Sequence, residues 1–148
     1  MKQKKPNISV FIEDPSFDSV IKEDDVLRIS SFFLDRFSCK SNVSIILVND
    51  HDMQNLNFTY RQKNCPTNVL SFPMEDDHYL GDIFLSFGVI KRESLEQNKT
   101  FENHFTHLLI HGLLHLLGYD HINPEDQNKM ENLEIKFLQE LCIPNPYI

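Results

Sequence analysis

The sequence predicts an α/β protein in which helices pack on a small mixed sheet. Two observations lead to this class. Short apolar runs rich in β-branched residues alternate along the chain with longer segments whose apolar residues recur at helical spacing. The 148 residues contain no internal repeat, low-complexity tract or linker, and they suffice to bury a core. We therefore expect one domain over residues 1–148.

The first half of the chain is predicted to hold two strands and two helices. Residues 8–12 (ISVFI) and 43–48 (VSIILV) are short, apolar and β-branched, which is typical of strands. Between them, apolar residues recur at helical spacing over residues 23–37. Asn49 is a suitable cap for a second helix, which we expect to end at Arg61, where a cation suits the helix dipole.

The second half is predicted to hold two more strands and then three helices. A strand over residues 69–72 is expected to stop at Pro73, because proline has no N–H to donate to a sheet. An acidic turn over residues 74–78 would follow it. The remaining segments, predicted from apolar spacing and capping residues, are a strand over 80–87 and helices over 88–97, 101–117 and about 124–141.

The composition argues for an intracellular globular protein. No apolar run approaches the roughly 20 residues of a membrane span, and the first residues lack the apolar region of a signal peptide. The three cysteines (Cys39, Cys65 and Cys142) are odd in number and form no CxxC pair. This usage fits reduced thiols in a cytoplasm, so we expect a cytoplasmic location.

The net charge of −8 argues against a protein that coats nucleic acid nonspecifically, because such affinity comes from neutralising phosphates with basic residues. The charge does not exclude a nuclease. A divalent ion would add positive charge at the place where a phosphate binds, and the formal count of charged side chains omits it.

Residues 111–121 (HGLLHLLGYDH) form the most informative stretch of the sequence. His111 and His115 are four residues apart, so on a helix their imidazoles share one face and can bind one ion. Gly118 can adopt the left-handed conformation that ends a helix, and the following turn could bring His121 back as a third ligand. Three histidines with an open fourth position are typical of a catalytic zinc site.

The same helix carries two further histidines, so spacing alone does not choose the ligands. His104 and His107 continue the stripe of His111 and His115, and hydrogen-bonded core histidines are the simpler interpretation of any one of them. Residues 105–119 contain no charged residue, however, and several buried imidazoles without partners would be costly. We therefore predict a metal site at the three motif histidines. His107 is expected beside it or in packing, and His104 too far along the helix.

The expected chemistry depends on one residue that the motif lacks. Zinc proteases with this spacing have a glutamate as general base where this chain has Gly112. A metal could still activate water and polarise a phosphoryl oxygen, so phosphodiester hydrolysis is better supported than proteolysis. Arg61 is the candidate cation for the developing negative charge, although a helix-dipole arginine needs no such role. Asp120 could orient a ligand imidazole, accept a proton, or serve only the turn.

The motif resembles the signature of the YbeY family of bacterial endoribonucleases, which mature ribosomal RNA. Further stretches resemble that family at collinear positions, so the resemblance covers about residues 8–148. They are 56–61 (LNFTYR), 66–73 (PTNVLSFP), 80–83 (LGDI) and the closing 145–148 (NPYI). Asn64 and Cys65 depart from the charged residues that many members carry there, which concerns local RNA contacts rather than the metal motif.

The resemblance implies a single α/β domain with a small, mostly parallel sheet of about four strands, about five helices and a metal helix like that of the zinc proteases. It implies that His111, His115 and His121 bind one zinc ion and that Arg61 is the functional arginine near it. The implied activity is single-strand-specific endoribonuclease in late 16S rRNA 3′-end maturation and ribosome quality control. Single-stranded rRNA would be the substrate, with the small ribosomal subunit or assembly factors as partners.

Several alternatives stay open at the level of sequence. Three imidazoles also suit nickel, iron or copper. The general base could be Asp120 or a water bound to the metal. A metalloprotease that uses Asp120 as base and a non-enzymatic ribosome-assembly factor with a structural metal are the competing functions. His51 and His78 lie in polar segments, and we expect them at the surface.

Overall fold

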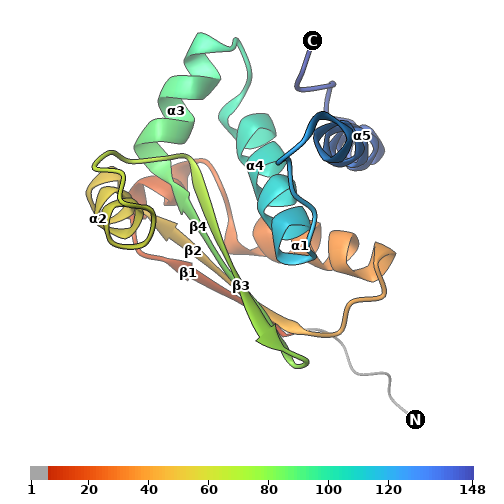
Figure 1. Ribbon diagram of the computed structural model, residues 1–148. Helices are drawn as coiled ribbons and strands as arrows, with labels where there is room; N and C mark the ends of the chain where they lie inside the picture. The colour runs from red at the N-terminus through yellow and green to blue at the C-terminus, as the bar shows by residue number, and fades with distance from the viewer. Residues whose placement is uncertain (1–6) are drawn as a thin grey trace.

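The computed structural model describes residues 7–148, and its elements follow the predicted order with one addition, the 3-10 helix η1 (Figure 1). The elements are β1 (Ile8–Ile12), η1 (Pro15–Ser19), α1 (Glu23–Arg36), β2 (Asn42–Val48), α2 (Asp50–Arg61), β3 (Val69–Asp76), β4 (Tyr79–Ser86), α3 (Phe87–Glu96), α4 (Phe101–Leu116) and α5 (Pro124–Glu140). Within residues 7–148, no helix is both long and apolar enough to cross a membrane.

The four strands form one mostly parallel sheet in the order β1-β2-β4-β3. β1 pairs with β2, and β2 with β4, in parallel, whereas β3 and β4 form an antiparallel hairpin at the edge. The predicted fold class, an α/β protein with a small and mostly parallel sheet of four strands and five α-helices, is confirmed.

The expected end of the third strand at Pro73 is wrong. β3 continues through Pro73 to Asp76, so most of the expected acidic turn is strand, and only Asp77 and His78 form the turn to β4. Pro73 is tolerated because β3 is the edge strand, where a residue without an N–H leaves no internal ladder bond unmade.

Helices cover both faces of the sheet. In Figure 1, α2 lies on one side, α1 and α4 lie on the other, and α5 lies outside α4. The alternation of side chains along β2 divides its apolar residues between two cores. Val43, Ile45 and Leu47 belong to the large core with α1, α4 and α5. Ile46 and Val48 belong to a smaller cluster with Met53 of α2.

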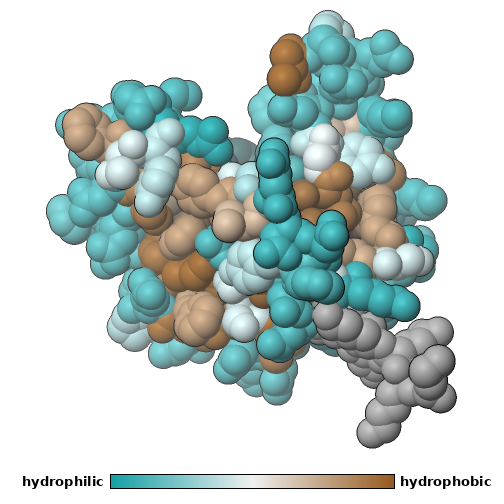
Figure 2. All heavy atoms as spheres, turned by 60° about the horizontal axis from the view of Figure 1, so that its bottom comes forward, coloured by the Kyte–Doolittle hydropathy of each residue, from teal (hydrophilic) through white to brown (hydrophobic). Residues whose placement is uncertain are grey.

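Large apolar side chains also remain at the surface. Figure 2 shows hydrophobic residues gathered within one face of the molecule and bordered by hydrophilic ones. Among residues 7–148, the large hydrophobic residues that stay exposed are Phe11, Phe58, Tyr60, Met74, Leu95, Ile122, Tyr147 and Ile148.

Asp50 joins the start of α2 to the start of α3. Its Oδ1 accepts hydrogen bonds from Ser86 Oγ (2.6 Å) and the Val89 amide (3.1 Å), and its Oδ2 lies 3.0 Å from Arg92. A Cβ on Gly88 would lie 2.4 Å from Oδ2, so glycine permits this approach. Burial by itself raises the pKa of Asp50, but the bonds from Ser86, Arg92 and Val89 outweigh it and lower the pKa below 3.8.

We expect Asp50→Asn to lower the free energy of unfolding at pH 7 by about 2 kcal/mol, because it weakens charge-assisted hydrogen bonds. The folded-state pKa is depressed, so this contribution is fully present above the unfolded value of 3.8 and is lost as pH falls from there through the lowered folded-state pKa. In urea titrations from pH 7 to 3, the difference between the two proteins should therefore shrink toward the acid end. Asp52→Asn, on the same helix turn, is the control, and an equal loss in it would contradict the assignment.

Candidate metal centre

The last turn of α4 and the loop after it bring the three motif histidines together. His111 and His115 lie on one face of α4. The helix ends at Leu116 with Leu117 as its C-cap, and Gly118 adopts a positive φ of 98°, which is easy for glycine and turns the chain back. The Tyr119 amide donates to the Leu114 carbonyl at 3.1 Å and fixes this turn. His121 follows from the loop, outside the helix.

The ligand atoms of these histidines face one point. One nitrogen each of His111, His115 and His121 lies within 4.8 Å of the other two, and residues 7–148 contain no other such group of three or more ligand residues. The Nε2 atoms of His111 and His115 are 3.0 Å apart. Three nitrogens at such separations could bind one ion from one side and leave a position open toward the cavity.

The hydrogen bonds of the helix histidines determine which nitrogen is free. His115 Nδ1 lies 3.0 Å from the Tyr119 carbonyl, and His111 Nδ1 lies 3.0 Å from Glu134 Oε1. Carbonyl and carboxylate oxygens only accept, so both Nδ1 atoms carry the proton. In the neutral rings both Nε2 atoms then present lone pairs to one another, which is unfavourable without a cation between them. The donor set therefore fits a metal ion.

The environment of His115 keeps its ring neutral. Burial lowers the pKa of His115, and the neighbouring His111 and His121 lower it further. A neutral imidazole is the form that binds metal, so the site does not need to expel a proton from this ligand near neutral pH.

His121 is held less tightly than the helix histidines. Its side chain is 55% exposed, and its Nδ1 is 3.9 Å from Asp120 Oδ1, which is too long for a hydrogen bond. Asp120 Oδ1 instead accepts from the backbone amide of His121 at 2.7 Å. The Asp120 carboxylate thus stabilises the loop that carries the third histidine, and it also lines the cavity.

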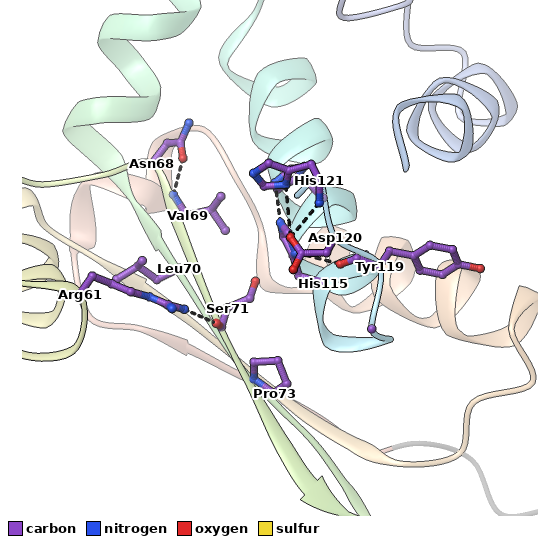
Figure 3. Close-up of a pocket in the computed structure, with 12 residues that line it drawn as sticks. Arg61, Asn68, Val69, Leu70, Ser71, Pro73, His115, Tyr119, Asp120 and His121 are labelled. Atoms are coloured by element: carbon purple, nitrogen blue, oxygen red, sulfur yellow. Dashed lines mark hydrogen bonds and ion pairs between the residues drawn. The ribbon is translucent and has the colours of Figure 1, made fainter. Parts of the chain in front are cut away.

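The histidines form one wall of a cavity of about 580 Å³, and β3 and Arg61 form the opposite wall (Figure 3). The residues lining it are Arg61, Asn68, Val69, Leu70, Ser71, Pro73, His111, His115, Gly118, Tyr119, Asp120 and His121. Arg61 extends from the end of α2 across β3, where its guanidinium donates to the Ser71 carbonyl at 3.3 Å. It also lies 5.7 Å from the ring centre of Phe72.

Gly112, at the position of the protease glutamate, lies where α4 touches the sheet. A Cβ there would be 3.0 Å from Ile83 Cγ2 and 3.1 Å from Ser71 Oγ. Ser71 Oγ also donates to the Gly112 carbonyl at 3.2 Å. Both contacts are tighter than usual and both are to side chains of the sheet, so a glutamate at this position would require Ile83 and Ser71 to move. The close packing of the helix on β3 and β4 therefore disfavours the protease base here.

The remaining histidines of α4 are paired with carboxylates from other helices. His104 is buried and lies 2.9 Å from Glu93 of α3, and His107 lies 2.8 Å from Glu134 of α5. Among residues 7–148, the other ring nitrogen of each has no partner. His107 therefore lies beside the three histidines as expected. His107 and His104 are core histidines with one ring nitrogen paired and the other left without a partner, so the simpler interpretation applies to them only in part. His51 and His78 are exposed.

Sequence reasoning missed Glu134, which the structure places directly behind the three histidines. Its Oε1 contacts both His107 and His111. Burial by itself raises the pKa of Glu134, but the hydrogen bonds from the two histidines outweigh it and lower the pKa to about 2. A signal existed in the sequence. Met130, Glu134 and Leu138 are spaced by four residues, so the glutamate falls on the apolar face of its helix.

The fold and the site together define a class of α/β proteins with a candidate centre for one metal ion beside the edge of a sheet. In this class a buried helix supplies two histidines, and the loop after it supplies the third. The comparison with protein families then identifies the particular family. Residues 12–142 match the family described as endoribonuclease YbeY, and the chain belongs to this family.

Individual relatives agree with this assignment. The chain is 47% identical to "Endoribonuclease YbeY" of Ehrlichia canis over 127 residues, which are 84% of this chain and 82% of the relative. It is 45% identical to the protein of the same name from Ruthia magnifica over 144 residues, or 93% and 99% of the two chains. A solution structure from Thermotoga maritima matches with a TM-score of 0.64 and 25% identity, covering 90% of this chain and 91% of that one.

We expect Gly112→Glu to lower the free energy of unfolding by more than about 3 kcal/mol, because it forces a carboxylate into the contact between α4 and the sheet. It should not create protease activity. Asn132→Glu, at an exposed position on α5, is the control and should change stability by less than about 0.5 kcal/mol. Thermal unfolding and a casein assay measure both effects, and a stable Gly112→Glu protein that cleaves casein would contradict the interpretation.

Proposed function

We propose that this chain is a metal-dependent endoribonuclease, folded as one domain over residues 1–148, in which His111, His115 and His121 hold a single ion. The observation that carries the proposal is the pair of Nε2 atoms 3.0 Å apart, each with its Nδ1 hydrogen committed elsewhere. Membership of the endoribonuclease YbeY family supplies the class of reaction, hydrolysis of RNA phosphodiester bonds.

Zinc is the ion that the donor set favours. Three neutral imidazoles with one open position suit a catalytic zinc site, although other divalent transition metals accept the same ligands. When bound, the ion supplies a Lewis acid for a phosphoryl oxygen and lowers the pKa of a water molecule. The cysteines take no part, because none of them belongs to the ligand group.

Arg61 is the residue that we assign to the negative charge of the reacting phosphate. Its guanidinium lies on the wall of the cavity opposite the histidines. The Ser71 carbonyl and the Phe72 ring hold it in place without neutralising its charge. A phosphate between the two walls would meet the cation of Arg61 on one side and the histidine centre on the other, which stabilises charge that develops in the transition state.

The substrate that we infer is single-stranded RNA. A cavity of about 580 Å³ suits an unpaired segment, whereas a paired helix presents its backbone on a wide, convex surface. We assign the activity to 16S rRNA 3′-end maturation and ribosome quality control in the cytoplasm. The net charge of −8 fits an enzyme that reaches its RNA through a partner on the small ribosomal subunit rather than by general attraction to phosphates.

His115→Ala should abolish zinc binding and RNA cleavage together, because it removes a half-buried ligand from the centre of the site. Elemental analysis and cleavage of a labelled single-stranded RNA measure the two effects. His51→Ala, at an exposed position, is the control and should retain both. Full metal and full cleavage in His115→Ala would overturn the proposed function. Chelation that unfolds the chain instead of only stopping cleavage would favour a structural metal.

Arg61→Ala should lower kcat for RNA cleavage about 100-fold or more while zinc content and thermal stability stay near those of the parent, because the arginine acts on the phosphate and not on the metal. Arg61→Lys should recover only part of the loss, since lysine cannot make the same planar contacts. Lys63→Ala, in the adjacent exposed loop, is the matched control. Equal losses in the two alanine variants would contradict a specific role for Arg61.

A further inference from the structure

The apolar core next to the candidate metal centre contains one fully buried carboxylate. Glu134 lies on the face of α5 that packs against α4, its side chain is 1% exposed, and its neighbours along the helix face, Met130 and Phe137, belong to the large core. A buried carboxylate is costly unless its oxygens are hydrogen-bonded, so its presence there needs an explanation.

Three donors satisfy this carboxylate. Oε1 lies 2.8 Å from His107 Nε2 and 3.0 Å from His111 Nδ1, and Oε2 accepts from the Tyr147 hydroxyl at 2.8 Å. Two of these donors lie one turn apart on α4. The third comes from the end of the chain. The Glu134 carboxylate is therefore a bridge between the metal helix and the C-terminal segment.

We propose that Glu134 is a positioning residue for the metal centre, and that Tyr147 holds Glu134 in place from the C-terminal segment. The carboxylate fixes the His111 ring with its proton on Nδ1, so that Nε2 faces the ion. A carboxylate behind a ligand imidazole also makes the imidazole a stronger donor to the metal. The inference rests on the proposed function, because it concerns the same three histidines.

The C-terminal segment is itself fixed in position. Lys99 Nζ donates to the Pro146 carbonyl at 2.8 Å, and the Asn145 side chain accepts from the Tyr147 amide at 2.9 Å. The Tyr147 ring packs edge-on against His107, with centroids 5.5 Å apart. The contacts of the preceding residues and of its own ring thus direct the tyrosine hydroxyl toward Glu134, although about half of the residue is exposed.

His111 and His115 are oriented by different acceptors, which separates the role of Glu134 from that of the fold. The Tyr119 carbonyl holds His115 as part of the turn that ends α4. The carboxylate that holds His111 belongs to another helix and can be replaced without changing any backbone hydrogen bond. A substitution of Glu134 therefore tests the orientation of one ligand only.

The test compares two substitutions of Glu134 in the full chain. Glu134→Gln keeps an oxygen that can accept from His111 but removes the charge, and Glu134→Met removes the acceptor while filling a similar volume. Competition with a chromophoric chelator should show zinc affinity about 10-fold lower for the first and about 100-fold lower for the second. Tyr147→Phe should lower it about threefold, because it removes one hydrogen bond to the carboxylate.

A second readout reports on positioning without any metal. Nitrogen chemical shifts of the His111 ring in the metal-free protein should show the proton on Nδ1 in the parent and in Glu134→Gln, but a mixture of tautomers in Glu134→Met. Loss of packing alone would not change the tautomer of one ring. If Glu134→Met fails to fold, the zinc affinities of Glu134→Gln and Tyr147→Phe test the inference. Lower affinity in both supports it, and parent-like affinity in both overturns it.

Glu131→Gln is the matched control, because it removes the same charge one turn earlier on α5. Among the described residues, Glu131 accepts a hydrogen bond from Gln127 and forms no hydrogen bond or ion pair with a histidine, although it lines a small cavity beside His111. Its zinc affinity should stay within about twofold of the parent, since partly exposed charges are screened. Parent-like affinity in both Glu134 variants would overturn this inference and leave the proposed function intact. Zinc binding by His115→Ala would overturn the proposed function itself.

Discussion

The close contact between α4 and the sheet is the constraint on which the rest of the structure depends. The helix is buried along most of its length, and at Gly112 its backbone lies so close to Ile83 and Ser71 that an added side chain would have to displace them. This contact sets the height of His111 and His115 above β3 and therefore the width of the cavity. It also disfavours, at position 112, the glutamate on which zinc proteases with the same histidine spacing depend.

Burial of α4 creates a second requirement. Four imidazoles lie along a helix that has little contact with water, so they need hydrogen-bond partners from the protein. The protein meets it with partners from outside the helix. Glu93 of α3 hydrogen-bonds to His104, and Glu134 of α5 hydrogen-bonds to both His107 and His111. The backbone of the turn after α4 hydrogen-bonds to His115. Each histidine is thereby fixed in rotation, and the free nitrogens of the last two are left facing the cavity.

Local patterns predicted most of the fold and the three histidines of the candidate centre. The elements were predictable because the β-branched runs, the helical spacing and capping residues such as Asn49 all act over short distances. Pro73 was misassigned because its effect depends on which strand lies at the edge of the sheet, and sequence does not give that order directly. Glu134 was missed because its partners lie 23 and 27 residues away on another helix.

The position of β3 at the sheet edge has a further consequence for the molecule in a crowded solution. An edge strand ordinarily presents unpaired backbone groups that can recruit a strand from another chain. In β3 the Ser71 carbonyl is occupied by Arg61, and Pro73 has no N–H to offer. The strand that bounds the cavity therefore offers fewer free backbone groups to a strand of another chain, at the same residues that must stay accessible to substrate. The cavity can thus stay open without leaving this edge free to pair.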